Sequence, residues 1–394
     1  MMSAVLSNPN HPKYGVATIP FPIPRDQYTY CMELLAALEI GDALKADCKV
    51  VAVESFFSVL KRTEMLTVNV EELNYLAKRL DSFDTGEAAQ FQAMAHKLEL
   101  FELKDLINLT FCCQQATVIT DFSDLAAIGR DHYMNLHGGS ASVDELNKLD
   151  GKGTARQLIE SGSGTVTPYG VVYDNGMKLE QVYDGRFFPC YYYEPNAITV
   201  AVTSKAEPED TEHITWLFLP MVQEEIDRAL LRGGITDPSE IRLSLEDSWL
   251  PHEVLDLLDM DHVDISELNA LVQALDEFSD MSIRKYAAAA VMARPHTTEQ
   301  AKHLAENLDL FDFAPSASTP EEYGKYMIQQ SGHFDYDENL DAFYDYEKYG
   351  TERMNAEDGM FTDRGYIAYK GYYSMEEVMN GGQSSHMVLG GLSR

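Results

Sequence analysis

The sequence predicts an α+β protein, an elongated multi-domain chain built from two tandem homologous units. Three observations support this prediction. The length of 394 residues exceeds one ordinary domain, a pattern of residues returns at an offset of 195, and strand-type and helix-type segments alternate within each repeat. Hydrophobic residues make up 45% of the chain, so it can bury a large core and is not an acidic disordered protein.

The internal repeat is clearest in one pair of segments. Val68–Phe83 and Val263–Phe278 share eight of sixteen positions at the offset of 195. Farther along, the same offset relates four more residues to identical partners: Gly129, Gly164, Thr167 and Gly170. An offset that persists over a hundred residues is difficult to obtain by chance. We therefore predict a first repeat at 13–190 and a second repeat at 197–375.

Each repeat is predicted to begin with a mixed α/β part, at 13–66 and 197–262. In the second repeat, ITVAV and HITWLFL have the composition of strands joined by an acidic turn. A helix-type segment, VQEEIDRALL, and a further strand, IRLSL, follow them. The first repeat has KVVAV in place of that last strand.

A small helical part comes next, at 67–120 and 263–317. Its apolar residues recur at helical spacing: Leu73, Leu76, Leu80 and Phe83 in the first repeat, and Leu268, Leu271, Val272, Leu275 and Phe278 in the second. The segments KYAAAAVMA and TTEQAKHLAENL continue the helical character of the second repeat.

A C-terminal α+β part completes each repeat, at 121–190 and, in a more acidic form, at 318–375. In the second repeat a helix should begin near Thr319-Pro320-Glu321-Glu322, because proline is favoured in the first helical turn. A strand is predicted at GYIAY, matched by GVVY in the first repeat. Residues 376–394 are expected to form a flexible tail.

The net charge of −34 is abnormal, and it is unevenly distributed. The first 200 residues carry 26 acids and 16 bases, whereas the remainder carries 38 acids and 14 bases. In the matched helices, Lys78 and Arg79 correspond to Gln273 and Ala274. Eleven acids and no lysine or arginine lie between Arg242 and Arg284. The fold is thus retained while basic partners are lost. A solvated acidic face and adaptation to high salt are the plainer interpretations that stay open.

The most concentrated acidic segment is DYDENLDAFYDYEKYGTE at 335–352, which has seven carboxylates, four tyrosines and one base, Lys348. Its spacing resembles the start of an EF-hand loop. Such a loop needs glycine at its sixth position and glutamate at its twelfth, where this chain has Leu340 and Tyr346. Weak binding of divalent cations stays open, but we predict no metal site and no cofactor.

No catalytic arrangement is evident. The histidines lack a metal-binding spacing, and the glycine-rich segments HGGS and GSGTVTPYG lack both a Walker lysine and G-x-S-x-G. Cys112-Cys113 follows an apolar stretch and is expected in the core. We therefore predict that the protein is not an enzyme, and an acidic enzyme with an unrecognised site is the weaker alternative.

The sequence also predicts a cytoplasmic location. Five cysteines without a C-x-x-C pair indicate reduced thiols. The N-terminal residues have no apolar segment of signal-peptide type, and no apolar stretch reaches 18 residues, so no membrane association is expected.

The charge itself suggests a function. Phosphate contacts need lysine and arginine, so direct nucleic-acid binding is not expected. Carboxylates could instead take the place of phosphates. With one DNA charge per about 1.7 Å, the 64 acids match about 110 Å of duplex and the net charge about 58 Å. Such a surface could fill the basic DNA groove of an enzyme, with tyrosines adding rigid contacts.

Two groups of acids are the candidate partner-binding residues. They are Glu246, Asp247, Glu253, Asp256, Asp259, Asp261, Asp264, Glu267, Asp276, Glu277 and Asp280 in the first group, and Asp335, Asp337, Glu338, Asp341, Asp345 and Glu347 in the second.

Several motifs resemble ArdA-type antirestriction proteins. They are the helix ELNxLxxxLDxF, the helix start EEYGKY, and NLDAFYDYEKYGTE followed by GMFTDRGYIAY. The resemblance is best from about 263 to 370. It is weaker in the first repeat, where LDGKGTARQL replaces most of the acidic run.

The resemblance implies an elongated, three-part mimic of bent B-DNA that is encoded on mobile elements and pairs with itself. It also implies that the protein inhibits type I restriction–modification enzymes, the host defence enzymes that bind DNA, by filling their DNA-binding groove. Here two ArdA-like repeats lie in one chain, so self-association stays open. A CRISPR effector or a nucleoid protein is the alternative target.

Overall fold

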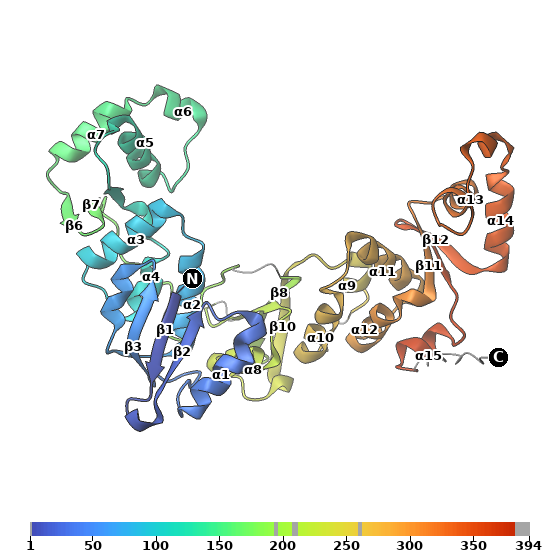
Figure 1. Cartoon of the computed structure of the whole chain (residues 1–394), viewed down its shortest axis with the longest axis horizontal. Coiled ribbons are helices and arrows are strands. Elements are labelled where there is room, and N and C mark those ends of the chain that lie inside the picture. The colour runs from blue at the N-terminus through green and yellow to red at the C-terminus, as the bar shows by residue number, and fades with distance from the viewer. Residues whose placement is uncertain (1, 193–195, 207–211, 259–261, 383–394) are drawn as a thin grey trace, which may run out of the picture. The chain divides into compact units, whose positions relative to one another are not determined.

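The computed structural model describes residues 2–192, 196–206, 212–258 and 262–382. They form two compact units (Figure 1). Unit 1 comprises Met1–Pro195, Asp210–Trp216 and Val222–Thr236, and unit 2 comprises Asn196–Glu209, Leu217–Met221 and Asp237–Arg394. Both contain helices and small antiparallel sheets, so the predicted α+β class is confirmed.

Unit 1 begins with a four-stranded sheet of order β2-β1-β3-β4. Its strands are β1 (Met2–Ser7), β2 (Val16–Phe21), β3 (Cys48–Ser55) and β4 (Thr67–Val68). Strand β1 is antiparallel to both β2 and β3, and its residues Ala4 and Leu6 are fully buried. The predicted mixed part began at residue 13 and left this strand out. Six residues at a chain end carry too little pattern to signal a strand, and pairing on both edges makes β1 central.

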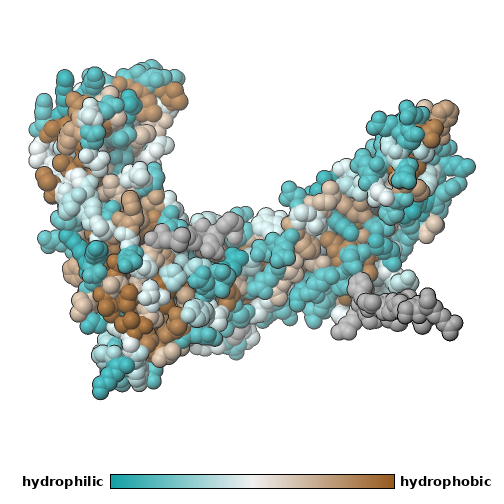
Figure 2. Space-filling model, in the orientation of Figure 1, coloured by the Kyte–Doolittle hydropathy of each residue, from teal (hydrophilic) through white to brown (hydrophobic). Residues whose placement is uncertain are grey.

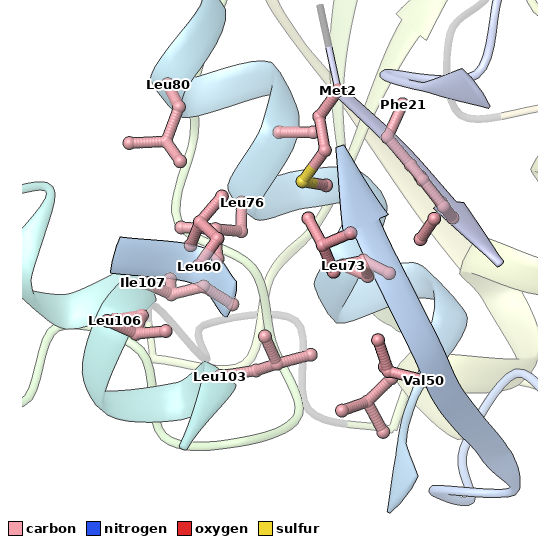
Figure 3. Packing of buried hydrophobic residues seen from close by; sticks show 14 of the residues in the cluster. Met2, Phe21, Val50, Leu60, Leu73, Leu76, Leu80, Leu103, Leu106 and Ile107 are labelled. Carbon is pink, nitrogen blue, oxygen red and sulfur yellow. The ribbon is translucent and has the colours of Figure 1, made fainter. Parts of the chain in front are cut away.

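The helical part of unit 1 packs on this sheet. It contains α2 (Val70–Asp81), α3 (Thr85–Lys97) and α4 (Leu103–Leu109), and α1 (Tyr28–Ala37) precedes it. Figure 3 shows leucines of α2 and α4 meeting side chains of the sheet, with Leu73, Leu76 and Leu80 buried as their helical spacing predicts. Asn69 accepts hydrogen bonds from the first backbone N–H groups of α2 and so begins the helix.

The last part of unit 1 has a three-stranded sheet of order β5-β7-β6. Its elements are β5 (Thr117–Ile119), α5 (Leu125–Leu136), α6 (Val143–Lys148), α7 (Gly151–Glu160), β6 (Thr165–Thr167) and β7 (Gly170–Tyr173). Helices α5 and α7 meet at their backbones: a Cβ atom added to Gly129 would lie 1.8 Å from the carbonyl oxygen of Gly151.

Unit 1 also contains α8 (Gln223–Gly233), which the sequence had placed in the mixed part of the second repeat. Polar contacts to α2 hold it there. The Arg228 Nε atom donates to Glu71 Oε1 at 2.6 Å, and Lys78 Nζ donates to Glu225 Oε1 at 3.3 Å. The position of α8 therefore depends on charges that lie more than a hundred residues away in the sequence.

Arg232 of α8 is only 5% exposed. Its guanidinium donates to the carbonyl oxygens of Ala43, Arg186 and Gly185, to Asn69 Oδ1 and to the Tyr183 hydroxyl. Tyr183 also donates to Glu72 Oε1 at 2.8 Å. These bonds join α8, the segment 183–186 and the N-terminus of α2 in one buried network.

Unit 2 repeats this plan. Its first sheet has the order β10-β8-β9, with strands β8 (Ile198–Ser204), β9 (Thr215–Leu219) and β10 (Ile241–Ser248). The helices are α9 (His252–Leu255), α10 (Ile265–Leu275), α11 (Asp280–Ala293) and α12 (Thr298–Glu306). The last part has a sheet of order β11-β13-β12, formed by β11 (Phe311–Pro315), β12 (Asp358–Thr362) and β13 (Gly365–Tyr369), with helices α13 (Pro320–Gln329) and α14 (Tyr346–Ala356).

Short 3₁₀ helices lie between these elements. They are η1 (Pro12–Tyr14), η2 (Arg25–Gln27), η3 (Ser58–Thr63), η4 (Cys113–Gln115), η5 (Pro238–Glu240), η6 (Leu308–Leu310) and η7 (Glu338–Phe343).

Corresponding helices begin 195 residues apart. This spacing holds for α1 and α8, α2 and α10, α3 and α11, α4 and α12, α5 and α13, and α7 and α14. Hydrogen bonds recur as well: Asn74 Oδ1 accepts from Ile23 N at 2.8 Å, and Asn269 Oδ1 accepts from Met221 N at 2.9 Å. The offset seen in the sequence therefore relates elements that occupy equivalent places.

The segment predicted as a flexible tail begins differently from the prediction. Met375–Met379 forms a short helix, α15, and Val378 is buried. The Met379 carbonyl oxygen lies 2.9 Å from His303 Nδ1 of α12. Ser374 and Glu377 form a capping box, a sequence signal that the tail prediction overlooked. Residues 383–394 of the predicted tail lie outside the described residues.

Gly324→Ala should separate α13 from α14. A Cβ atom at Gly324 would lie 2.0 Å from the Tyr346 carbonyl oxygen, so the helices must move apart. Overpacking of this kind costs about 1–3 kcal/mol. Hydrogen exchange should show reduced protection of both helices, whereas Lys325→Ala on the exposed side of α13 should leave it unchanged. Equal protection in both variants would contradict the close backbone contact.

Arg232→Met should loosen α8. The change removes five hydrogen bonds and leaves buried carbonyl groups and Glu72 without their cation. Removing one partner of a buried ion pair costs about 3–5 kcal/mol. Exchange of the α8 amide protons should accelerate accordingly. Arg156→Met, at an exposed arginine of α7, is the control and should change stability by less than about 0.5 kcal/mol.

Candidate partner-binding surface

The second group of predicted acids lies on η7 and α14, next to α13. Gly324 and Gly350 allow α13 and α14 to touch at their backbones, since a Cβ atom on Gly350 would lie 1.8 Å from the Pro320 carbonyl oxygen. Asp337 accepts a hydrogen bond from Asn339 N and begins η7, and Asp345 accepts one from Lys348 N and begins α14. Two of the acids thus fix the local structure and remain exposed.

Asp341 behaves differently because its carboxylate is half-buried and faces other side chains. Its Oδ1 atom accepts hydrogen bonds from Tyr346 Oη at 2.5 Å, Tyr336 Oη at 2.7 Å and Gln329 Nε2 at 2.8 Å. The bonds from the two tyrosines lower the pKa of Asp341 below its usual value. The same carboxylate raises the pKa of Tyr336, and burial followed by this hydrogen bond raises that of Tyr346.

The tyrosines of the segment are therefore used within the protein. The rings of Tyr336 and Tyr344 lie 6.0 Å apart, and those of Tyr344 and Tyr346 lie 5.7 Å apart. The sequence predicts these rings as rigid contacts for a partner. The structure gives Tyr336 and Tyr346 another task, which is to hold the acidic segment in one conformation through Asp341.

The other predicted acids of this segment are exposed: Asp335, Asp337, Glu338, Asp345 and Glu347. Figure 2 shows a largely hydrophilic surface over α13 and α14, with hydrophobic residues among the hydrophilic ones. The segment therefore presents carboxylates to solvent on a framework that its own tyrosines and helix caps stabilise.

The first group of acids lies on β10, α9, α10 and α11. Eight are exposed: Glu246, Asp247, Asp256, Asp264, Glu267, Asp276, Glu277 and Asp280. Asp264 begins α10 by accepting hydrogen bonds from Ser266 N and Glu267 N. Glu267 Oε2 accepts a hydrogen bond from Thr298 Oγ1 at 2.6 Å. Asp259 and Asp261 lie outside the described residues.

Glu253 forms an internal ion pair. Its side chain is 8% exposed, and its two oxygens accept hydrogen bonds from Arg364 Nε and Nη2 at 2.6 and 3.1 Å. Burial raises the pKa of Glu253, but the hydrogen bonds and charge of Arg364 outweigh it, so the pKa lies below the usual value. The pair links α9 to the β12–β13 turn, and its negative charge is neutralised.

The C-terminal end of α10 combines acids with an unfavourable helix position. Asp276 is the C-cap and Glu277 follows it, although negative charge there opposes the helix dipole by about 0.3–1 kcal/mol per residue. The last turn of α10, a helix that the structure describes in full, has no basic residue, whereas α2 has Lys78 and Arg79. In unit 1, Lys78 pairs with Glu225, and the Arg79 guanidinium lies 4.3 Å from the Phe111 ring centre. In unit 2, α10 therefore forms without the basic residues that would interact favourably with the dipole at its C-terminal end.

Residues 142–157 and 337–352 occupy equivalent positions in the two repeats. The first segment has three acids and three bases, whereas the second has six acids and one base. Lys152 corresponds to Glu347, and both lie in the first turn of matching helices, α7 and α14. Asp150 and Asp345 cap these helices in the same way. The caps are retained and the exposed charge changes, so the fold does not require the dense acid.

Sequence reasoning missed two features of this surface. One is the role of Arg364 and Gln329, whose partners can be identified only from the tertiary structure. The other is the exposure of Leu340 and Phe343 on η7. The sequence contained a sign of this exposure, because Phe343 occupies the position of the charged residue Lys148 in the first repeat.

Among the described residues, no group of three or more histidines, cysteines, aspartates or glutamates is arranged to hold a metal ion. Within the same residues, no helix is both long enough and apolar enough to span a bilayer.

Part of the chain matches a known protein family. Residues 211–368 match the family described as Antirestriction protein (ArdA). The matched region contains most of the second repeat and all the predicted partner-binding acids. No curated protein matches the chain significantly.

Asp341→Asn should loosen the acidic segment. The pKa of Asp341 is lowered in the folded protein, so its contribution to stability is present above the unfolded pKa of about 3.9 and is lost as the pH falls through the folded value. Hydrogen exchange of residues 336–346 should show this acid-dependent loss in the wild type. The variant should show weak protection at every pH, whereas Asp335→Asn should behave as the wild type. An identical pH profile in both variants would refute the role of Asp341.

Proposed function

We propose that this chain, whose residues 211–368 match the ArdA antirestriction family, is a DNA mimic without enzymatic activity. In this proposal it acts in the cytoplasm and competitively occupies the DNA-binding groove of type I restriction–modification enzymes. The supporting observation is the set of thirteen exposed acids of the second repeat, together with the contrast between its segment 337–352, which has six acids and one base, and the equivalent segment 142–157, which has three of each.

Carboxylates can replace phosphates because both present negative oxygens to lysine and arginine. A mimic must also hold these oxygens in place, since each side chain ordered on binding reduces the affinity. The helix caps Asp264, Asp337 and Asp345 meet this need, because their backbone contacts restrict their motion. The Asp341 network restricts the segment between the last two in the same way.

The charge of the second repeat also favours rapid association. Opposite potentials attract partners over distances of about 10 Å at 0.1 M salt and increase the association rate. Inhibition should therefore weaken as the salt concentration rises. Single charge changes should have small effects because many acids act together.

The two repeats then have different tasks. Bases of unit 1 contact residues of the same unit: Lys78 pairs with Glu225, and Lys97 pairs with Asp174 at 2.6 Å. Its segment 142–157 has no net charge. In this proposal the first repeat is mainly structural and the second repeat carries the partner-binding surface. One chain could then provide two ArdA-like repeats without a second copy.

Competition with duplex DNA tests the proposal. A purified type I restriction–modification enzyme is incubated with labelled duplex and increasing amounts of the protein at about 50 and 200 mM salt, a range over which phosphate-type contacts lose much affinity. The wild-type protein should displace the duplex at the lower salt and do so poorly at the higher salt. Failure to displace it at the lower salt would rule out this function.

A variant neutralising five exposed acids of unit 2 should compete at least about tenfold less well, and its affinity should depend less on salt, by about one unit of slope per lost contact. The changes are Asp335→Asn, Asp337→Asn, Glu338→Gln, Asp345→Asn and Glu347→Gln. Asparagine is also a favoured N-cap residue, so Asp337→Asn and Asp345→Asn should preserve the caps of η7 and α14.

The matched control neutralises five exposed acids of unit 1: Asp121→Asn, Asp124→Asn, Asp144→Asn, Glu145→Gln and Asp150→Asn. It has the same change in net charge and should inhibit as the wild type. Equal losses in both variants would show that net charge, and not this surface, determines binding.

A further inference from the structure

An exposed apolar pair lies in the middle of the acidic segment. Leu340 and Phe343 belong to η7, a 3₁₀ helix, in which side chains three residues apart lie on the same face. Their exposed fractions are 48% and 83%, so this face is directed to solvent. Asp341, which lies between them in the sequence, instead faces Tyr336 and Tyr346 and accepts hydrogen bonds from both.

The fold does not explain this pair. The equivalent segment of the first repeat, α6, has the exposed charged residues Glu145 and Lys148 at the same two positions. Leu340 and Phe343 bury little surface in the protein, so they contribute little to its stability. Exposed apolar residues that adjoin one another and are surrounded by polar residues are typical of interaction sites.

The pair is also held in position. Asp337 caps η7 at its start, and the bonds from Tyr336 and Tyr346 to Asp341 anchor the helix between Leu340 and Phe343. Nearby, the Phe334 ring packs edge-on against Tyr349 at 5.8 Å. An aromatic side chain on such a fixed support loses little conformational entropy on binding, which is a property of interface hot spots.

The surroundings define the partner. The exposed acids Asp337, Glu338, Asp345 and Glu347 lie before, within and after η7. A surface that accepts this region must therefore be basic at its rim and nonpolar at its centre. A phosphate backbone or a second acidic segment of this chain would be repelled.

We propose that Leu340 and Phe343 form an apolar anchor that enters a nonpolar recess in the basic groove of the DNA-binding enzyme. This inference rests on the function proposed above and adds a specific contact to it. Enzymes that modify bases have such a recess, because they extrude a nucleotide from the duplex into a pocket that stacks it between apolar side chains. Phe343 then takes the place of the extruded base while the carboxylates take the place of phosphates.

The anchor and the acids should differ in their salt dependence. Attraction between charges weakens with salt, whereas burial of an aromatic ring does not. Loss of the anchor should therefore reduce the affinity by a similar factor at every salt concentration and leave the salt slope unchanged. Loss of acids should reduce the slope.

The experiment compares Phe343→Ala and the double variant Leu340→Ala/Phe343→Ala with wild type. Binding to an immobilised, purified type I restriction–modification enzyme is measured at about 50, 100 and 200 mM salt, as association and dissociation rates. We expect Phe343→Ala to bind at least about tenfold more weakly at each salt, chiefly through faster dissociation. Phe56→Ala, at a 71% exposed phenylalanine of unit 1, is the matched control and should bind as wild type.

The outcomes separate this inference from the proposed function. If the wild type binds the enzyme and Phe343→Ala binds equally well, the anchor is refuted while the DNA mimic stands. If the wild type does not bind even at the lowest salt, the proposed function fails and the anchor fails with it. Sedimentation of the free proteins gives a further check. A change in oligomeric state caused by Phe343→Ala would assign the pair to self-association and overturn the inference.

Discussion

The scarcity of positive charge constrains the whole structure. Only 30 lysines and arginines accompany 64 acids, and several of these bases lie in structural contacts. Arg228 and Arg232 hold α8 in unit 1, and Arg364 joins α9 to the β12–β13 turn in unit 2. A base used in this way cannot screen the surface. Folding thus places these cations in internal contacts, and fewer bases are left to neutralise the exposed acids.

An exposed surface of like charge destabilises a compact protein, so other interactions must compensate. Buried leucines provide this compensation in the helical parts of both units. They lie 195 residues apart in pairs: Leu73, Leu76 and Leu80 in α2, and Leu268, Leu271 and Leu275 in α10. Close backbone packing at Gly324 and Gly350 does so in the last part of unit 2. At the surface, the acidic C-terminal end of α10 breaks a local rule of helix stability. Such conflicts are expected where a residue serves binding more than stability.

The acidic segment shows how one run of residues divides its tasks. Asp341 and two tyrosines turn inward, Asp337 and Asp345 serve as caps and remain exposed, and Leu340 and Phe343 turn outward. Partner binding by charge alone would be strong only at low salt. A surface that combines fixed carboxylates with an apolar ring can attract a basic groove at a distance and retain it at contact.

Periodicity and charge are properties of neighbouring residues, and for this reason much of the fold could be predicted. The offset of 195, the helices around Leu73 and Leu268, the Thr319-Pro320 helix start and the GYIAY strand could all be recognised without the structure. The excess of acid in the second repeat and the match of its motifs to ArdA could be recognised in the same way.

Side-chain direction depends on partners that are distant in the sequence, and only the tertiary structure decided it. Sequence reasoning treated Glu253 and Asp341 like their neighbours, but Glu253 meets Arg364 across 111 residues and Asp341 meets three donors. Pairing between residues that are distant in the sequence also places α8 in unit 1 and makes β1 a central strand. The sequence by itself determined how much charge the protein carries and on which elements. The structure decided which of those charges are neutralised inside and which reach solvent, because long-range pairing has no local signature.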